Sequence, residues 1–404
     1  MTIDQNLTPK LAMNKYIQDT IRNASRSILK GLTRPQKKAV SEVIRGLFTA
    51  GTPVLRHLIQ SETKTAKKQA EKYAWHLENT ELRSVVDEFA LRKAKAEVRK
   101  NTIIAYDLTD INKECAKKMA KLKRVWDGSK RKTAPGYTLH GVGVNNLLLK
   151  LEVHDGDENT QNQTRRKVIK KISESFSKKG IWVFDRGNDD KYFFKFLRHK
   201  LKVQFIARLK EDRKVCLVKT RALIQVRDLP PGRYTIYLMH RWNVKVDKRY
   251  KYTLIISNHL EEKEPVRLLG YLKDDYSIEQ IVTMYLQRWG IENIFKRAKT
   301  KFNLEKIRVL NHQKFVNLIS LIQLAINLCT ITFIQIQKLT YSLISGVLLA
   351  YRKFIKLKNL TFNIDSYISF LKYSLKPLII HTKRAPPEQL SLFSRRQVVK
   401  LGSF

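Results

Sequence analysis

The chain has 404 residues, enough for about two to three domains of ordinary size. Its 79 Lys and Arg against 36 Asp and Glu give a formal charge of +43, and basic residues occur in nearly every block of ten. Such a chain attracts polyanions, mainly nucleic acid or an anionic membrane surface, over a broad face rather than through one tail. Three distant cysteines and the lack of CxxC and HExxH motifs argue against a disulfide framework and a standard zinc site. With an N-terminus that has no apolar signal region, they predict a protein of the reducing cytoplasm.

Residues 1–95 are predicted to form a helical DNA-binding region. Apolar residues spaced three and four apart indicate amphipathic helices in "LTPKLAMNKYIQDTIRNASRSI", "LTRPQKKAVSEVIRGLFTAGTPVLRHLIQ" and "ETKTAKKQAEKYAWHLE". Any one of these helices is compatible with an ordinary solvated surface. A set of them on a chain of charge +43 favours contact with DNA.

Residues 96–310 are predicted to form an α/β domain. Three strands are indicated by "TIIAYDLTDI", "GYTLHGVGVN" and "LLLKLEVHD". A helix closed by Gly180 follows, and then a strand in "IWVFDRG", a helix in "DKYFFKFLRHK" and a strand in "VQFIARLK". This order predicts a mixed sheet with helices, neither all-α nor all-β.

Within that domain, residues 213–275 read as an inserted block of antiparallel strands separated by turns. A helix then begins at Ser277, a suitable N-cap, and is expected to run through "SIEQIVTMYLQRWGIENIFKRAKTKF".

Residues 311–404 are predicted to form a helical, basic C-terminal region. Its segment 315–337 carries no charge and is long enough to span a bilayer. The segment nevertheless contains amide side chains that would be costly in lipid, at Asn317, Gln323, Asn327, Gln335 and Gln337. We therefore predict a buried core helix in place of a membrane span.

Four polar residues recur along "YLQRWGIENIFKRAK". On one continuous helix Tyr285, Arg288, Glu292 and Lys299 would share a wedge of roughly 60°, since each residue advances about 100°. An ordinary explanation is a solvated face held by an Arg288–Glu292 pair four residues apart. The alternative is a functional face, and the aspartates upstream favour it.

Two aspartates are expected at strand ends, Asp107 after "TIIAY" and Asp185 after "IWVF". Each of them alone is compatible with a turn or a cap. Two strand-end carboxylates and one helical carboxylate together provide hard oxygen ligands of the kind that Mg²⁺ prefers. A pair of such ions about 3.5–4 Å apart assists phosphodiester chemistry by stabilising both the attacking and the leaving oxygen.

These residues resemble a large family of bacterial insertion-sequence DDE transposases, which have a ribonuclease H-like catalytic core. "YLQRWGIENIFKRAK" matches the family's Y-x2-R-x3-E-x6-K signature, "DRGND" its D-R-x-x-D pattern and "YDLTD" its D-x-T pattern. The resemblance spans roughly residues 100–310. Asp185 and Glu292 are 107 positions apart, a long separation that resembles the one in family members with a β-rich insertion between these two residues.

The resemblance implies a role for each matched residue. Asp107, Asp185 and Glu292 would be the catalytic, metal-binding triad for Mg²⁺, with Mn²⁺ as a substitute. Tyr285, Arg288 and Lys299 would hold DNA phosphates beside the cleavage site, and the positive charge of the two basic residues would offset repulsion between the triad and DNA.

Further residues have more general expectations. Arg208 corresponds to an arginine that the family often has near the transferred DNA end. Trp242, in the β insertion, would stack on a flipped base, or it belongs to the core. Arg186 is expected to contact DNA or to form a structural ion pair, and Asp189 to support the metal ligands. Trp126 is placed in a basic loop after the first strand, either contacting DNA or solvated.

The resemblance implies a transposase that cleaves the ends of its element and joins the 3′-OH ends to target DNA. Its partners would be double-stranded DNA, namely terminal inverted repeats and target, and a second copy of the chain in a homodimer on DNA. Two alternatives stay open: a metal-dependent nuclease without strand transfer, and a non-catalytic DNA-binding protein derived from a transposase. A membrane protein is a more distant alternative.

Overall fold

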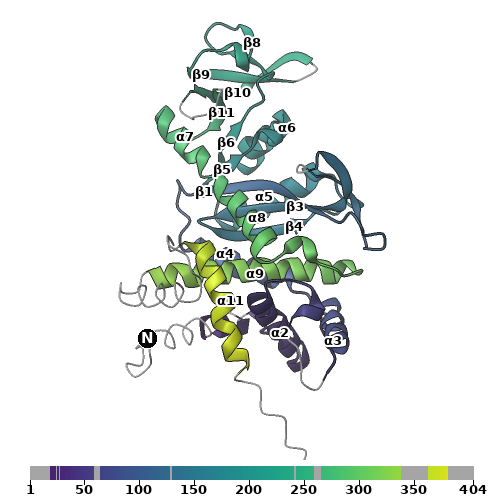
Figure 1. Ribbon diagram of the computed structural model, residues 1–404. Helices are drawn as coiled ribbons and strands as arrows, with labels where there is room; N and C mark the ends of the chain where they lie inside the picture. Colours follow the sequence, from purple (N-terminus) through teal and green to yellow (C-terminus); the bar gives the residue numbers. More distant parts are fainter. Residues whose placement is uncertain are drawn as a thin grey trace, which may run out of the picture.

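The computed structural model describes residues 19–23, 25–26, 28–58, 64–127, 130–240, 243–258, 265–337 and 363–380. Figure 1 shows an elongated molecule with a β-rich end, a central sheet with its helices, and a group of helices at the opposite end. The long helix α9 (His312–Gln337) runs between the sheet and those end helices. Trp242 lies outside the described residues, so its stacking role stays a prediction.

The centre of the sheet confirms the predicted mixed α/β fold. Strand β1 pairs antiparallel with β3 on one side and parallel with β5 on the other, and β5 pairs parallel with β6. Strands β2 and β4 both pair with β3. The central strands are β1 (Ile103–Asn112), β2 (Lys123–Asp127), β3 (Lys132–Val144), β4 (Leu147–Val153), β5 (Ile181–Phe184) and β6 (Gln204–Arg208), with helices α5 (Gln161–Ser175) and α6 (Lys191–Lys195) in the connections.

Strand β2 corrects one expectation from the sequence. Trp126 was expected in a loop, but it lies on β2 opposite Thr133 of β3. The segment pairs as a strand because Val125 is buried while its neighbours face solvent, the alternation that suits an edge strand.

The inserted strands extend the central sheet instead of forming a separate one. Strand β11 pairs antiparallel with β6, and β10, β9, β7 and β8 follow in that order, which makes an eleven-stranded sheet among the described residues. The inserted strands are β7 (Lys214–Leu217), β8 (Leu223–Gln225), β9 (Gly232–His240), β10 (Asn243–Ser257) and β11 (Val266–Tyr271).

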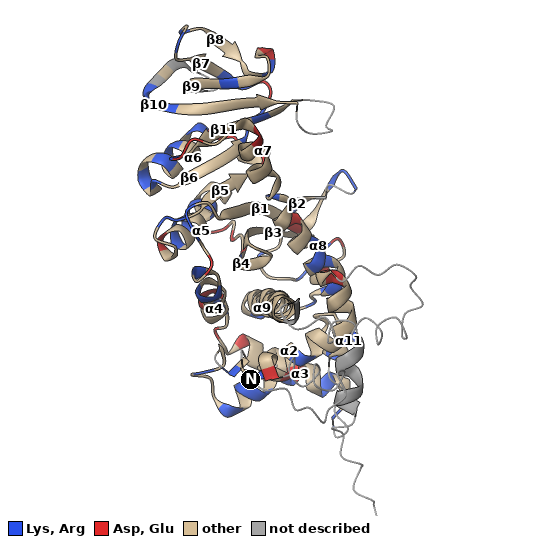
Figure 2. Cartoon of the chain, turned by 90° about the vertical axis from the view of Figure 1, so that its left-hand side faces the viewer, with Lys and Arg blue, Asp and Glu red and all other residues tan. Residues whose placement is uncertain are grey.

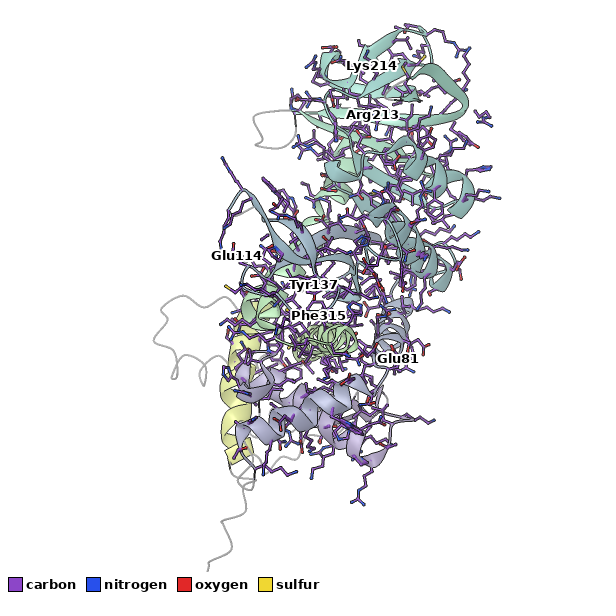
Figure 3. All side chains as sticks on the ribbon, turned by 90° about the vertical axis from the view of Figure 1, so that its right-hand side faces the viewer. Glu81, Glu114, Tyr137, Arg213, Lys214 and Phe315 are labelled. Atoms are coloured by element: carbon purple, nitrogen blue, oxygen red, sulfur yellow. The ribbon has the colours of Figure 1, made fainter. Side chains whose placement is uncertain are left out.

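Helices from both ends of the chain pack around α9. Figure 1 shows α2 and α3 beyond α9, α4 beside it and α11 crossing it. On the sheet side, the ring of Tyr137 from β3 lies 4.1 Å from that of Phe315 in α9, centroid to centroid, as Figure 3 shows. The surrounding helices are α2 (Arg34–Ala50), α3 (Ala66–Glu78), α4 (Arg83–Lys95) and α11 (Ile364–Ile380).

Helix α9 is apolar and long enough to cross a membrane, but it is a buried core helix here. Its amides bind backbone groups that would otherwise be unpaired. Asn327 accepts from the Leu148 N–H at 2.7 Å and donates to the Leu148 carbonyl at 2.8 Å. Gln323 similarly binds the Leu149 carbonyl and the Leu151 N–H, both at 3.1 Å. The polar residues of α9 therefore cover the edge strand β4, where an open strand edge would be costly.

We expect Asn327→Leu to lower the free energy of unfolding by about 2–4 kcal/mol, because two buried backbone groups of Leu148 lose their partner. Denaturant unfolding measures the change. Gln335→Leu, at an exposed position near the end of the same helix, is the matched control and should change stability by less than about 0.5 kcal/mol. Equal stability of both variants would contradict the proposed role of Asn327.

Candidate active site

Asp107 on β1 and Asp185 directly after β5 lie at neighbouring positions of the sheet. The parallel pairing of β1 and β5 ends at Tyr106 opposite Phe184, so each aspartate is the next residue along the chain after this pair. Parallel strands lie about 4.8 Å apart, which brings the two carboxylates to one edge. The expectation that Asp107 ends its strand was wrong. Strand β1 continues beyond Asp107 because β3 remains its antiparallel partner as far as Asn112.

The helix expected after Ser277 is broken into two. Ser277 does cap helix α7 (Ile278–Leu286), and its Oγ accepts from the Gln280 N–H at 3.2 Å. Helix α8 (Trp289–Lys301) starts after a tight turn in which the Arg288 N–H donates to the Tyr285 carbonyl at 3.0 Å. A three-residue turn advances more per residue than an α-helix. The shared wedge calculated for one continuous helix therefore does not hold.

Two glycines of β3 let α8 approach the sheet closely. Gly141 lies opposite Asp107, and a Cβ there would stand 2.3 Å from the ring of Phe295. A Cβ at Gly143 would stand 3.0 Å from Ile291. The missing side chains thus allow α8 to lie on β3 and to carry Glu292 towards Asp107.

We expect Gly141→Ala to lower the free energy of unfolding by about 1–3 kcal/mol, because the new methyl group overlaps the Phe295 ring. Phe295→Leu in the same chain should recover part of this loss. Gly290→Ala is the control, since a Cβ there meets nothing within 4 Å. Thermal unfolding of the four proteins tests this, and equal losses at both glycines would contradict the close-packing argument.

Arg288 links the two elements of the site. Its Nη1 lies 3.0 Å from Oδ2 of Asp107 and 2.6 Å from Oε1 of Glu292. Only 10% of the Arg288 side chain is exposed, against 50% for Glu292. One buried guanidinium therefore bridges a carboxylate of the sheet and a carboxylate of the helix, while Glu292 remains open to solvent.

The charges of the triad act on one another. Burial raises the pKa of Asp107 to about 7, with a further increase from Asp185 and Glu292 that Arg288 opposes. Burial also raises the pKa of Tyr285, while Arg288 and Arg208 counteract the increase. The charges at the site therefore influence one another, and they belong to the three carboxylates, Tyr285, Arg208 and Arg288. The buried carboxylate of Asp107 would be stabilised in its charged form by further positive charge beside it.

Two residues that position Asp185 could not be identified from the sequence. Nη1 of Arg165, on α5, donates to Oδ1 of Asn188 at 2.8 Å, so the amide nitrogen of Asn188 faces Asp185 and donates to its carboxylate. Arg165 is itself buried, with its guanidinium 3.8 Å from the centre of the Phe193 ring. The only indication of Asn188 in the sequence was its place within "DRGND". Nothing in the sequence indicated that Arg165 is its partner.

The structure also describes the surroundings of the other residues singled out from the sequence. Asp189 has a fully buried side chain that pairs with Arg213 and accepts from the Lys210 N–H at 2.9 Å, so it holds the turn after β6. Lys299 pairs with Glu305 at 3.2 Å and makes no hydrogen bond to the triad. Arg186 is exposed, and Arg208 lies half-buried at the end of β6.

The donor set fits a hard divalent cation, although the side chains are not gathered around one. In the described part of the chain, no three His, Cys, Asp or Glu side chains lie close enough to hold a metal ion. Between Asp107 and Glu292 stands the guanidinium of Arg288. Carboxylate oxygens suit Mg²⁺ or Mn²⁺, and a cation bound beside Asp107 would lower the pKa that burial raises there.

The order of the sheet and the carboxylates on β1, after β5 and on α8 define a protein of the ribonuclease H-like class. The family model described as "Transposase DDE domain" matches residues 98–328, more than half of the 404-residue chain, so the chain belongs to this transposase family. A search of curated proteins finds none that matches the chain.

Proposed function

We propose that this protein is a DNA transposase that cleaves the ends of its insertion element and joins the 3′-OH ends to target DNA. The observation that carries the proposal is the ion pairing of Arg288 with both Asp107 of β1 and Glu292 of α8. Asp185 directly follows β5, the strand beside β1, and its charge raises the pKa of Asp107. When bound, a pair of Mg²⁺ ions would stabilise the attacking and leaving oxygens of the phosphodiester.

The residues of the chain have separate tasks in this proposal. Asp107, Asp185 and Glu292 would hold the cations, and Asn188 keeps the carboxylate of Asp185 in place. Arg288 would exchange its contact with Glu292 for one with a DNA phosphate, and the half-exposed carboxylate of Glu292 would then turn to solvent or to a cation. Tyr285, Arg208 and Lys299 would position the same strand.

The charge distribution supports DNA as the partner. Figure 2 shows Lys and Arg on the β-rich end, on helices beside the sheet and on the helices at the opposite end. A basic surface of this extent suits a long duplex that contacts several parts of the protein, with terminal inverted repeats and target as the two substrates. We further propose a homodimer on DNA that holds both ends, acting in the cytoplasm.

The decisive experiment uses the purified full-length protein and DNA that carries the inverted repeats flanking its own coding region. We expect cleavage at the repeat ends and joining to a second DNA with Mg²⁺, and neither reaction with EDTA or scrambled repeats. Cleavage without end specificity or joining would favour the nuclease alternative. Tight binding of the ends without any cleavage would favour the non-catalytic alternative.

A further inference from the structure

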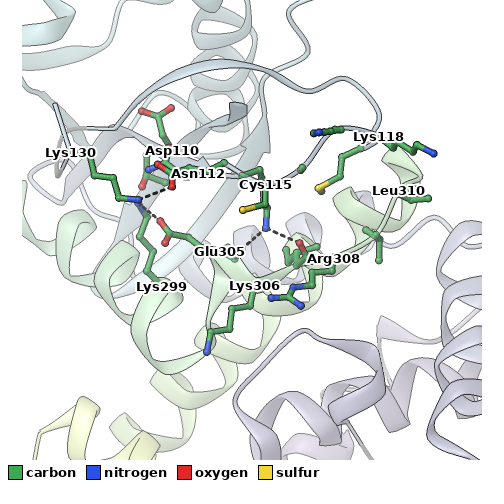
Figure 4. Close-up of a pocket in the computed structure, with 18 of the residues that line it drawn as sticks. Asp110, Asn112, Cys115, Lys118, Lys130, Lys299, Glu305, Lys306, Arg308 and Leu310 are labelled. Carbon is green, nitrogen blue, oxygen red and sulfur yellow. Dashed lines mark hydrogen bonds and ion pairs between the residues drawn. The ribbon is translucent and has the colours of Figure 1, made fainter. Parts of the chain in front are cut away.

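A large pocket opens directly beside the candidate active site. It has a volume of about 1210 Å³ and begins at Leu108, the residue that follows Asp107 on β1. Figure 4 shows its walls, which come from β1 and the segment after it, from Lys130 near the β2–β3 turn, from Lys299 on α8 and from the segment 305–310. Trp126 of β2 also lines the pocket.

The rim of this pocket carries available positive charge. Its three acidic side chains already have partners. Glu114 pairs with Lys130 at 2.8 Å, Glu305 pairs with Lys299 at 3.2 Å, and Asp110 accepts a hydrogen bond from the Thr138 hydroxyl at 2.6 Å. Five further basic side chains line the pocket and form no ion pair with any residue that the structure describes. Lys113 is buried and donates to backbone carbonyls, those of Glu305 and Ile307, and the other four are Lys117, Lys118, Lys306 and Arg308. The pocket therefore suits an anionic ligand with several charges.

The same pocket also exposes apolar surface. Seven large hydrophobic side chains are exposed in the described ranges, and three of them line this pocket. Trp126 is 57% exposed, Leu310 65% and Leu108 37%. An exposed indole among basic side chains is the combination that binds the flat face of a base and the phosphates around it.

We propose that this pocket binds a few unpaired nucleotides of a DNA strand next to the cleaved phosphate. Trp126 stacks on one base, and Lys117, Lys118, Lys306 and Arg308 hold the phosphates. An intact duplex does not suit the pocket as well, because its base faces are covered by their neighbours. The proposal rests on the proposed function for the position of this strand, since β1 carries both Asp107 and the first lining residues.

The test compares binding of two fluorescent DNA molecules by anisotropy, in EDTA and at fixed salt. One is a blunt duplex and the other is the same duplex with a single-stranded tail of about five nucleotides. Wild type should bind the tailed DNA more tightly. Trp126→Ala should weaken that complex about tenfold, the effect of losing one stacked base, and the blunt complex less than about twofold. Trp126→Phe should retain most of the tail preference.

The matched control is Trp75→Ala, since Trp75 is 60% exposed but lies on α3 at the opposite end. It should leave the preference for the tail unchanged, because any contact of α3 with the duplex is common to both DNA molecules. A second variant, Lys306→Gln, should reduce the number of counterions released on binding the tailed DNA by about one. The slope of the logarithm of the binding constant against the logarithm of the salt concentration measures this number.

Equal binding of both DNA molecules by wild type, or equal weakening of both by Trp126→Ala, would overturn the inference. These measurements are independent of cleavage. A wild-type protein that prefers the tail through Trp126 but never cleaves would refute the proposed function and leave the pocket assignment standing. A protein that cleaves element ends but shows no Trp126-dependent preference for the tail would refute the pocket assignment and leave the proposed function standing.

Discussion

Glu292→Gln is expected to lower the rate of Mg²⁺-dependent end cleavage by on the order of 10³-fold, which corresponds to about 4 kcal/mol of transition-state stabilisation. The substitution keeps the size of the side chain and removes its charge. Half of the Glu292 side chain is exposed, so the fold does not depend on that charge. Affinity for DNA should change less than about threefold, because a carboxylate makes no favourable contact with a phosphate.

Single-turnover cleavage of labelled element ends measures this effect, and anisotropy in EDTA measures binding. Glu174→Gln is the control, since that glutamate is 57% exposed on α5, away from the triad, and its loss should change the rate less than about twofold. Equal cleavage by wild type and Glu292→Gln would remove Glu292 from the chemistry. Loss of binding together with cleavage would assign it to DNA positioning instead.

Lys150→Met is expected to destabilise the protein by about 3–5 kcal/mol, the largest effect on stability that we predict. The ammonium of Lys150, on β4, pairs with Asp87 of α4 and lies 2.7 Å from Glu152. The Asp87 side chain is only 3% exposed, and without Lys150 its remaining side-chain partner is the Gln323 amide at 3.3 Å. Removing Lys150 therefore leaves a buried charge with one weak neutral contact.

Denaturant unfolding at several pH values tests this prediction. Burial raises the pKa of Asp87 above its ordinary value of 3.8, and the loss of Lys150 removes the main opposing charge. A carboxyl group whose folded pKa is raised takes up its proton in the folded state first, so the deficit of the variant should shrink as the pH falls towards 3.8.

Two further variants serve as controls for this pair. Lys123→Met breaks the exposed pair with Asp157, whose side chains are 45% and 54% exposed, and should cost less than about 1 kcal/mol. The double variant Asp87→Leu, Lys150→Met should regain most of the stability, because no unpaired charge remains. Equal, small losses for both lysines would show that the Asp87–Lys150 pair is effectively solvated.

Some features of the candidate site could be predicted because they depend on short stretches of chain. Ser277 caps a helix as expected, since a cap needs only the next three residues. The sequence also suggested that Asp107 and Asp185 act together, because each aspartate follows a short apolar run that is predicted to be a strand. The α7–α8 break was not predicted, because the apolar and polar pattern continues across it without a proline.

The sequence alone determined that the chain is a basic α/β protein of the transposase family, which acidic residues to test, and that the amide-containing apolar segment is a core helix. Only the tertiary structure decided the partners of these residues. Asn327 binds Leu148 of β4, which lies 179 positions away in the sequence, and Arg288 binds Asp107, which lies 181 positions away. Local patterns specify helices, strands and caps, whereas such pairings depend on how whole elements pack. The same reason explains why Trp126 had an uncertain role in the sequence and lines a basic pocket beside the candidate site in the fold.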